Sequence, residues 1–319
     1  MLKTAFVFPG QGSQSVGMLS DFVLQYPVIT QTFAQVSEVM GYDLWQLVQN
    51  GPAEQMNQTE HTQVLMLTAD VAVYKLLMQQ GIPEPLVMAG HSLGEFAALV
   101  AASSLSLEDA ALLVAERARI MQRAVPLGMG AMAAIVGLTD EQVATICLNS
   151  SLDDQRVMPA NYNAIGQVVI AGDTSAVERA LALADTAGAI LAKIIPVSVP
   201  CHCSLLVEAA EQFASQLAAV TFKTPAIDVI SNVDLSVYHS PEQIRGRLKE
   251  QLYSPVRWVE TIQLFKQRGV DLILECGPGR VLGGLTKRID RTLRAISVYD
   301  TINLEQVVEQ LQLSTIGGS

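Results

Sequence analysis

Short apolar runs alternate with longer amphipathic stretches along most of the chain. The short runs predict buried strands of a mostly parallel sheet, at 5–9, 85–90, 227–232 and 271–277. The longer stretches carry apolar residues at helical spacing and predict helices at 26–40, 64–80, 94–102, 107–124, 205–219, 241–252 and 256–268. This alternation predicts a doubly wound α/β fold, in which helices cover both faces of the sheet.

The pattern changes between residues 126 and 200. Four runs in this region predict strands, at 131–138, 158–163, 167–171 and 193–199. One helix is expected after the first of these strands and another after the third, which gives the order β-α-β-β-α-β of a ferredoxin-like unit. We therefore expect a small ferredoxin-like subdomain at 127–199, inserted into a larger α/β domain that is formed by 1–126 and 200–319.

Polar residues mark where the two helices of this small unit begin. Thr139 and Gln142 have the spacing of a capping box, in which each side chain binds the backbone N–H of the other residue. Ser175 and Glu178 have the same spacing at the second helix. We expect each helix to start directly after its threonine or serine.

The composition and the charge narrow the classes of function. Half of the 319 residues are apolar and 16% are charged, which is enough to bury one large core or two smaller ones. The chain has 20 lysines and arginines against 31 acidic residues, so its net charge of −11 disfavours a nucleic-acid partner, which needs a broad cationic surface. The partners are expected to be small molecules, or proteins that meet a local patch.

Neither a targeting segment nor a membrane span is expected. The N-terminus lacks the basic-then-apolar order of a secretory signal, and the longest apolar stretches, 96–107 and 129–138, are too short to span a bilayer. The sequence therefore predicts a cytoplasmic protein without membrane contact. The cysteines are too few for a disulfide scaffold, and we expect reduced thiols at Cys147, Cys201, Cys203 and Cys276.

The segment Gly90-His91-Ser92-Leu93-Gly94 lies between a predicted strand and a predicted helix. In such a nucleophile elbow the chain turns so sharply that side chains at the flanking glycines would collide with neighbouring backbone. Ser92 would stand at the carboxyl edge of a hydrolase-like sheet, where the start of the helix directs free N–H groups at a developing oxyanion. A tight turn with a purely structural role is the alternative.

A serine hydroxyl needs a base to become a nucleophile, and the chain has four histidines. His91 adjoins Ser92, but neighbouring side chains at a sharp turn point apart, so we place His91 in the wall of the entrance. His61 and His239 lie in polar segments and are expected to be solvated. His202 follows the small unit, where one element could carry it over a cleft, and it is the candidate base. A packed histidine beside two buried thiols is the equally weighted alternative.

The run Cys201-His202-Cys203 raises the question of a metal site. A structural zinc site needs four ligands, usually in pairs spaced by two to four residues, and the sequence has no second cluster of this kind. We therefore expect no metal.

Several motifs occur in order along the chain: Pro9-Gly10-Gln11-Gly12-Ser13-Gln14, Gly90-His91-Ser92-Leu93-Gly94, Arg117, Gly128-Met129-Gly130-Ala131-Met132, Gln167-Val168-Val169-Ile170-Ala171-Gly172, Ser198-Val199-Pro200-Cys201-His202 and Glu275-Cys276-Gly277-Pro278-Gly279. In order and in spacing, the chain resembles the bacterial malonyl-CoA:acyl carrier protein transacylases of type II fatty acid synthesis. The resemblance extends from the first strand to about Ile289.

The resemblance implies a ping-pong acyl transfer. Ser92 attacks the malonyl thioester with His202 as general base, coenzyme A leaves, and the phosphopantetheine thiol of acyl carrier protein takes the malonyl group. The backbone N–H groups of Gln11 and Leu93 hold the oxyanion, and the backbone carbonyl of Gln251 orients the histidine. Malonyl-CoA and acyl carrier protein are then the partners. The two thioesters are substrates, no cofactor is implied, and we expect a monomer.

The same resemblance assigns the malonyl carboxylate to Arg117. An arginine fork makes two parallel charge-assisted hydrogen bonds to a carboxylate, which acetyl lacks. A surface pair at helical spacing is the alternative for Arg117. Arg119 faces the opposite side of the helix and is expected to be solvated or paired with Glu116. Asn163 matches a family position in the pocket wall.

The chain departs from the family at Ala189-Ile190-Leu191, where members often carry a basic pair. Lys193 is the nearest cation, so the contacts that this pair makes with coenzyme A phosphates or carrier protein are in doubt. A helix over 280–294 offers another surface for an acidic carrier protein, because it would place four cations together: Lys287, Arg291 and Arg294 on one face, with Arg288 alongside. An ordinary solvated face is the alternative.

Three other functions use the same features. A serine hydrolase that cleaves thioesters would share the elbow but would leave Arg117 without a purpose. A non-catalytic scaffold that binds carrier protein would form no covalent adduct. Within the family, an acyltransferase of polyketide synthesis or of malonate decarboxylase is a further alternative.

Overall fold

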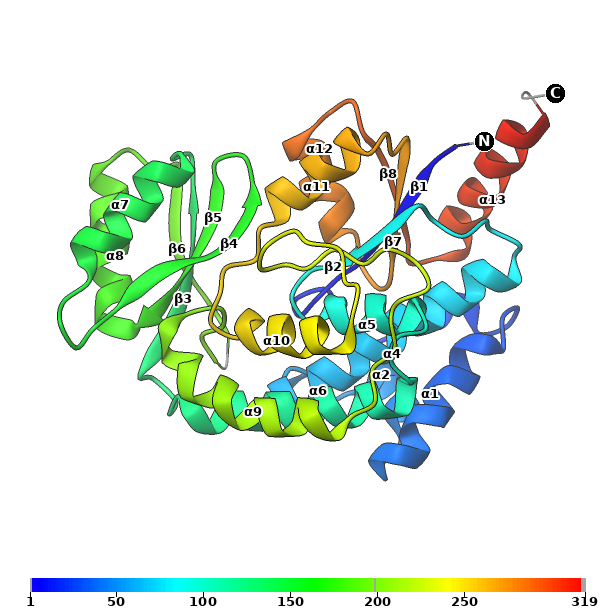
Figure 1. Cartoon of the computed structure of the whole chain (residues 1–319), viewed down its shortest axis with the longest axis horizontal. Coiled ribbons are helices and arrows are strands. Elements are labelled where there is room, and N and C mark those ends of the chain that lie inside the picture. Colours follow the sequence, from blue (N-terminus) through cyan, green and yellow to red (C-terminus); the bar gives the residue numbers. More distant parts are fainter. Residues whose placement is uncertain (1, 198, 317–319) are drawn as a thin grey trace.

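A computed structural model of the chain describes residues 2–197 and 199–316, which form two lobes around two separate sheets (Figure 1). The sheet of the larger lobe is entirely parallel and has the order β2-β1-β7-β8. Its strands are β1 (Thr4–Phe8), β2 (Val87–Gly90), β7 (Leu272–Cys276) and β8 (Arg294–Val298). In the register, Val7 lies opposite Ala89 on one side and Glu275 on the other.

Helices cover both faces of this sheet, which confirms the predicted fold class. The helices of the larger lobe are α1 (Val28–Met40), α2 (Leu44–Asn50), α3 (Ala53–Met56), α4 (Thr59–Gln79), α5 (Gly94–Ala101), α6 (Leu107–Ala124), α9 (Val207–Ala219), α10 (Pro241–Gln251), α11 (Trp258–Gln267), α12 (Val281–Ile289) and α13 (Thr301–Ile316). Side chains of β1 alternate between two cores. Phe6 and Phe8 join the core under α1, α4, α5 and α6, whereas Ala5 and Val7 pack with α11 and α12.

The edges of this sheet differ from the prediction. The segment 227–232 meets β2 only through an isolated bridge between Met88 and Val229, because the chain turns back and Ile230 bridges Val237. The strand that completes the other edge is β8, which was not predicted; its first residue, Arg294, was expected in a helix over 280–294. That expectation was wrong: α12 ends at Ile289, and Asp290 holds the following turn by accepting hydrogen bonds from Thr292.

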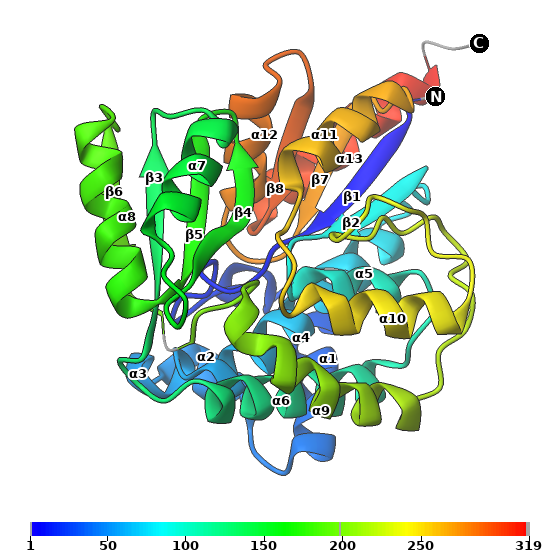
Figure 2. The ribbon, with the colours of Figure 1, turned by 60° about the vertical axis from the view of Figure 1, so that its left-hand side comes forward.

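The smaller lobe has an antiparallel sheet of the order β4-β5-β3-β6, as expected of a ferredoxin-like unit. Its elements are β3 (Gly130–Val136), α7 (Asp140–Ser150), β4 (Val157–Ala164), β5 (Gln167–Asp173), α8 (Thr174–Thr186) and β6 (Leu191–Ile195). Both helices pack on one face, and the other face looks toward the larger lobe (Figure 2). The predicted domain boundaries, 127–199 within 1–126 and 200–319, stay a prediction.

Two local predictions in this lobe had opposite outcomes. Thr139 and Gln142 form the expected capping box at the start of α7. The second box is wrong, because α8 begins at Thr174, and Asp173 before it accepts a hydrogen bond from the backbone N–H of Arg156 instead of capping the helix. The strand predicted at 193–199 lies at 191–195 instead, and residue 198 of that prediction lies outside the described residues.

The two lobes are joined by backbone as well as by side chains. The N–H of Tyr162 in β4 donates to the carbonyl of Val256 at 3.0 Å, and the N–H of Val256 donates to the carbonyl of Ala160 at 2.9 Å. The small sheet therefore sits against the segment that leads into α11 (Figure 2). No helix in the described residues combines the length and the apolar character needed to cross a membrane.

Candidate active site

The sharp turn between β2 and α5 can be formed only with glycine at two positions. Ser92 at its centre has φ +52°, a left-handed conformation that is strained for serine. A Cβ added to Gly90 would lie 1.8 Å from the carbonyl carbon of Gly94, and one added to Gly94 would lie 2.0 Å from the carbonyl oxygen of Phe8. The nucleophile elbow predicted from the sequence is thus present.

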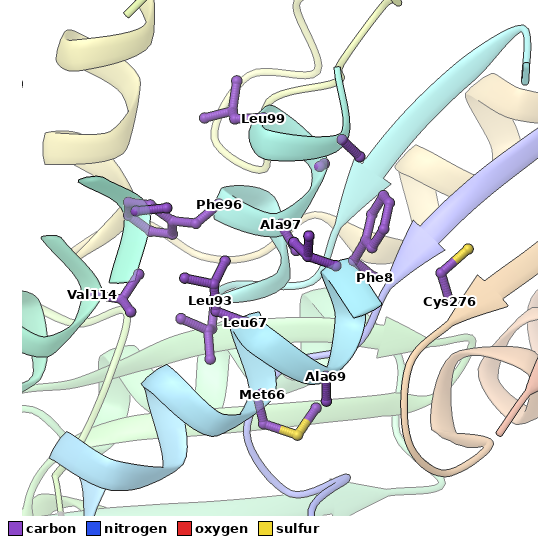
Figure 3. Close-up of a cluster of buried hydrophobic side chains, with 14 of the residues drawn as sticks. Phe8, Met66, Leu67, Ala69, Leu93, Phe96, Ala97, Leu99, Val114 and Cys276 are labelled. Atoms are coloured by element: carbon purple, nitrogen blue, oxygen red, sulfur yellow. The ribbon is translucent and has the colours of Figure 1, made fainter. Parts of the chain in front are cut away.

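The helix after the elbow is fixed by apolar packing. Leu93, Phe96 and Ala97 lie among side chains of α4 and α6 and beside Phe8 of β1, as Figure 3 shows. All of these side chains are buried. Because this core is close-packed, the turn that carries Ser92 is held rigidly.

Ser92 and His202 are in direct contact. The Oγ atom of Ser92 lies 2.7 Å from Nε2 of His202, which also has a left-handed backbone with φ +60°. Nδ1 of His202 donates to the backbone carbonyl of Gln251 at 2.7 Å. A carbonyl oxygen only accepts, so Nδ1 carries the proton and Nε2 is free to accept one from Ser92. The predicted pair is therefore brought together in the tautomer that a general base needs.

The surroundings of His202 keep its imidazole neutral. Burial, together with the nearby charge of Arg117, lowers the pKa of His202 to about 3. The hydrogen bonds to the carbonyls of Gln251 and Ser254 oppose this shift but do not outweigh it. At neutral pH the imidazole is unprotonated and available as a base.

Two free backbone N–H groups lie beside the elbow. Leu93 occupies the N-cap position of α5, and Gln11 lies in the loop after β1. A Cβ added to Gly10 would lie only 2.6 Å from the carbonyl oxygen of His91 and 3.8 Å from the backbone nitrogen of Leu93, so this loop and the elbow are in close contact. Within residues 2–197 and 199–316, the N–H groups of Gln11 and Leu93 donate no hydrogen bond. They can serve an oxyanion.

Arg117 is a buried cation whose partners are neutral. It is 1% exposed, and its Nη1 and Nη2 donate to the side-chain oxygens of Gln63 at 2.9 Å and of Gln251 at 3.0 Å. Its guanidinium lies over the ring of Phe96, and its Nε has no partner in the described part of the chain. Arg119 pairs at the surface with Glu116, as predicted. The alternative for Arg117, a surface ion pair, is wrong, because Arg117 is buried.

A pocket of about 610 Å³ opens between the lobes in front of Ser92 and His202. His91 and Asn163 lie in its wall, with Nε2 of His91 2.8 Å from Oδ1 of Asn163, and the edge of the His91 ring meets Trp258. The remaining walls come from the 10–14 loop, the start of α4 and the turn before it, the open face of the small sheet, the segment after β6, and α12. Their residues are Gly10, Gln11, Gly12, Ser13, Gln14, Asn57, Thr59, Met132, Asn161, Val169, Ile195, Pro196, Val197, Val199, Cys201, Val281, Leu282 and Leu285.

His61, His239 and the four thiols take no part in the contact between Ser92 and His202. His239 is exposed, as expected, whereas His61 is half-buried in the first turn of α4 against the ring of Tyr42, so its expected solvation is only partial. All four cysteines are free thiols. Among the described residues, no three His, Cys, Asp or Glu side chains form a group that could hold a metal.

The predicted cationic helix face does not exist as one face. Lys287 and Arg288 are exposed in the last turn of α12, whereas Arg291 lies in the following turn and Arg294 begins β8. The reason is the end of the helix at Ile289. The four cations remain exposed at neighbouring positions of one short segment, and Arg288 donates to the side chain of Gln167 in the small lobe.

Sequence reasoning missed a layer of polar residues beneath the elbow. Asn232 accepts a hydrogen bond from the backbone N–H of Ser92 at 2.7 Å, and the side chain of Gln251 donates to the backbone carbonyl of Ser92 at 3.0 Å. Glu95 and Tyr238 join the same network. For Gln251 the resemblance implied only the role of the backbone carbonyl. Asn232, Glu95 and Tyr238 were visible only as polar residues inside or beside apolar runs, a signal that does not say which other residue each will meet.

Comparison with known proteins places the chain in a family. The family model described as acyl transferase domain matches residues 5–310. The chain is 48% identical to the malonyl CoA-acyl carrier protein transacylase of Escherichia coli K12, over 97% of this chain and 100% of that protein. For the Haemophilus influenzae protein of the same name, the identity is 50% over 98% of this chain and 100% of that protein.

Solved structures agree with this placement. The malonyl CoA-acyl carrier protein transacylase from Coxiella burnetii superimposes with a TM-score of 0.95 at 48% identity, covering 97% of this chain and 98% of that one. A malonyl-transacylase in complex with a type II PKS acyl-carrier protein gives a TM-score of 0.95 at 48% identity, covering 97% and 99%. The chain therefore belongs to the acyl transferase family, among the malonyl CoA-acyl carrier protein transacylases.

Proposed function

We propose that this protein transfers the malonyl group of malonyl-CoA to the phosphopantetheine thiol of an acyl carrier protein, through a malonyl ester on Ser92, and so supplies fatty acid synthesis. The observation that carries the proposal is the 2.7 Å contact between Ser92 Oγ and His202 Nε2 at the base of the pocket between the lobes. The family membership shown above supports the same reaction.

The first half-reaction follows from the positions of the protons. His202 Nε2 takes the hydroxyl proton of Ser92 while Oγ attacks the thioester carbonyl, and the N–H groups of Gln11 and Leu93 receive the oxyanion. The imidazolium is stabilised because the carbonyl of Gln251 accepts from Nδ1. The intermediate then collapses, the coenzyme A sulfur leaves with the proton from His202, and the malonyl ester remains on Ser92.

The second half-reaction uses the same groups in reverse. The phosphopantetheine thiol gives its proton to His202 and attacks the ester carbonyl. The Ser92 oxygen leaves and recovers its proton from His202, so the free enzyme is regenerated. Both thiols must enter the same pocket, which requires the acyl group to stay deep in the site while they exchange.

We assign the malonyl carboxylate to Arg117. The guanidinium is buried and close enough to His202 to lower its pKa, and it is held by two amide oxygens without an acidic partner in ion-pair range within the described chain. A carboxylate would complete it with charge-assisted hydrogen bonds, whereas an acetyl group would leave it unpaired. Selection for malonyl over acetyl therefore follows from the burial of one cation.

We assign carrier-protein docking to the end of α12. Val281, Leu282 and Leu285 of this helix line the pocket, so α12 borders the site that the carrier-protein thiol must enter. None of the neighbouring cations makes an ion pair with a described residue: Lys287, Arg288, Arg291 and Arg294. On a protein of net charge −11, these cations offer an acidic partner a favourable local field.

We further propose that the protein acts in the cytoplasm, as a monomer, without a cofactor and without a nucleic-acid partner. The net charge of −11 supports the last of these statements. The relative solved with a type II PKS carrier protein keeps a polyketide role as the second candidate.

The fate of the bound malonyl group distinguishes transfer from hydrolysis. The protein is mixed with malonyl-CoA, freed of it rapidly, and divided between buffer and holo acyl carrier protein, and the covalent adduct is followed by intact mass spectrometry. A transferase keeps the adduct in buffer and loses it to the carrier protein. Equal loss in both samples would indicate a hydrolase, and absence of any adduct would indicate a scaffold. Parallel assays with carrier proteins of fatty acid and polyketide synthesis separate the two pathways.

A further inference from the structure

The side chain of Glu95 is buried directly beneath the elbow. It belongs to the first turn of α5, three residues after Ser92, and it is fully shielded from solvent. One of its oxygens accepts from the hydroxyl of Tyr238 at 2.5 Å and from the backbone N–H of Asn232 at 3.4 Å. The other oxygen accepts from the amide nitrogen of Gln251 at 2.6 Å. Each oxygen of this carboxyl thus has a partner.

The partners of Glu95 are the residues that hold the reacting groups. Asn232 accepts from the backbone N–H of Ser92 at 2.7 Å. The side-chain amide of Gln251 donates to the carbonyl of Ser92 and accepts from Arg117, while its backbone carbonyl binds His202. Glu95 fixes the direction of the Gln251 amide, because only the amide nitrogen can donate to a carboxylate, and the amide oxygen is then turned toward Arg117.

Glu95 is also the carboxyl group of this network that interacts with the charge of Arg117. A buried cation without an opposite charge is costly, and the groups that touch Arg117 directly are two amides and an aromatic ring. The other groups that face Glu95 are Tyr238, which is neutral, and the amides of Asn232 and Gln251. The charge of Arg117 favours the ionised form of Glu95.

We propose that Glu95 is a positioning residue that serves as the counter-charge of Arg117 in the malonyl-free enzyme, and that it takes up a proton from solvent when the malonyl carboxylate binds to Arg117. This inference rests on the proposed function, because it needs the carboxylate at Arg117. The guanidinium of Arg117 then has one negative charge beside it both without malonyl, from Glu95, and with malonyl bound, from the malonyl carboxylate. Burial raises the pKa of Glu95 to about 7, so ionised and protonated forms are both accessible near neutral pH.

The proposal predicts a pH-dependent choice between malonyl and acetyl. Below pH 7 Glu95 is protonated and Arg117 is free for the malonyl carboxylate, whereas above pH 7 the ionised Glu95 competes with it. The ratio of kcat/KM for acylation by malonyl-CoA to that by acetyl-CoA should fall about five- to tenfold from pH 6 to pH 8.5, a typical coupling between neighbouring sites. Taking the ratio cancels pH effects that both substrates share.

The matched variants are Glu95→Gln, which keeps the shape and removes the charge, and Tyr238→Phe, which removes one hydrogen bond and keeps the charge. In Glu95→Gln the ratio should stay flat across this range. In Tyr238→Phe the fall should remain but move to higher pH, because the lost bond stabilises the ionised carboxylate. A flat ratio in the wild type, or the same fall in Glu95→Gln, overturns the proposal.

Two further measurements distinguish failure of this proposal from misfolding of a variant and from failure of the proposed function. Wild-type enzyme mixed with malonyl-CoA near pH 7 in dilute buffer should take up protons, as seen with an indicator dye, and acetyl-CoA should cause none. Equal uptake with both substrates contradicts the role of Glu95. If Arg117→Ala keeps its preference for malonyl, the assignment of the carboxylate fails. If Arg117→Ala loses that preference while Glu95→Gln keeps the fall, only the role of Glu95 fails.

Discussion

Two fully buried carboxyl groups, Glu95 beneath the elbow and Asp70 in the middle of α4, have opposite surroundings. Burial raises the pKa of both groups. Each oxygen of Glu95 accepts hydrogen bonds, whereas in the described part of the chain neither oxygen of Asp70 has a partner. Asp70 instead lies so close to Gly277 that a Cβ there would be 2.2 Å from its Oδ1. Burial is common to both carboxyl groups, so the difference lies in their hydrogen-bond partners. A buried carboxyl group with partners can organise a site, whereas one without partners only lowers stability.

Glu275, the acidic residue near Asp70, resembles Glu95 in that both of its carboxyl oxygens accept hydrogen bonds. Glu275 is buried in β7, yet its two oxygens accept from the N–H groups of Leu282 and Gly283 at the start of α12 and from the hydroxyl of Ser297. Its charge raises the pKa of Asp70 further. Asp70 is consequently the one of these three acids with nothing to compensate its ionisation among the described residues.

The largest expected effect is the loss of acylation rate when the base beside the elbow is removed. We expect His202→Ala to lower the rate of acylation by malonyl-CoA about 10⁴-fold or more, because among the described residues no other base is within hydrogen-bonding distance of Ser92 Oγ. The free energy of unfolding should change far less. The measurement is a stopped-flow acylation rate beside a denaturant titration. His61→Ala on α4, outside the pocket wall, is the control, and near-normal acylation in His202→Ala would move the role of the base to another residue.

A smaller effect is expected from removing the cation that Glu95 supports. Arg117→Ala should reduce kcat/KM for malonyl-CoA about 10²- to 10³-fold, the size typical of a lost buried charge contact, and should reduce that for acetyl-CoA much less. Arg119→Ala, two positions along the same helix and at the surface, should leave both constants unchanged. Retained selectivity in Arg117→Ala would exclude it as the specificity residue.

The Asp70 region should respond in stability and not in activity. Because the pKa of Asp70 is raised, its folded form loses stability as pH rises above the ordinary value of 3.8. Asp70→Asn cannot ionise, so it should match the wild type at pH 4 and be about 1–3 kcal/mol more stable at pH 8, the scale of an uncompensated buried polar group. Urea titrations at both pH values test this, with Asp43→Asn on the surface as the control. A constant difference between the two proteins would show that Asp70 does not titrate.

The smallest effect is expected at the surface. Lys287→Glu together with Arg288→Glu should raise KM for acyl carrier protein about three- to tenfold at low salt and leave KM for malonyl-CoA unchanged. Added salt should shrink the difference between variant and wild type. Lys223→Glu, also exposed but outside the α12 segment, is the control. An equal rise of both constants would argue against a docking role.

Most of the larger elements could be predicted because their signals are local. The helix predicted at 107–124 is α6 itself, and the glycines of the elbow follow from collisions within a few residues. The ferredoxin-like order also follows from local periodicity. The prediction of the second capping box was wrong. The side chain of Asp173, just before α8, accepts a hydrogen bond from the backbone N–H of Arg156, and the spacing of Ser175 and Glu178 does not reveal this contact with a residue elsewhere in the chain.

What the sequence could not supply depends on contacts between distant segments. Glu95 meets Gln251, which is 156 residues away, and Asn232, which is 137 residues away. Arg117 was predicted as a carboxylate ligand, but its two amide partners could not be. The four cations near α12 were predicted to share one helix face because Asp290 was not recognised as the end of the helix.

The location of the covalent malonyl group tests the central claim most directly. After brief exposure to malonyl-CoA, the protein would be digested and its peptides mapped by tandem mass spectrometry. We predict one malonyl group, on Ser92, and none in Ser92→Ala. A malonyl group that persists in Ser92→Ala, or that maps to the thiol of Cys201 in the same pocket, would contradict the account.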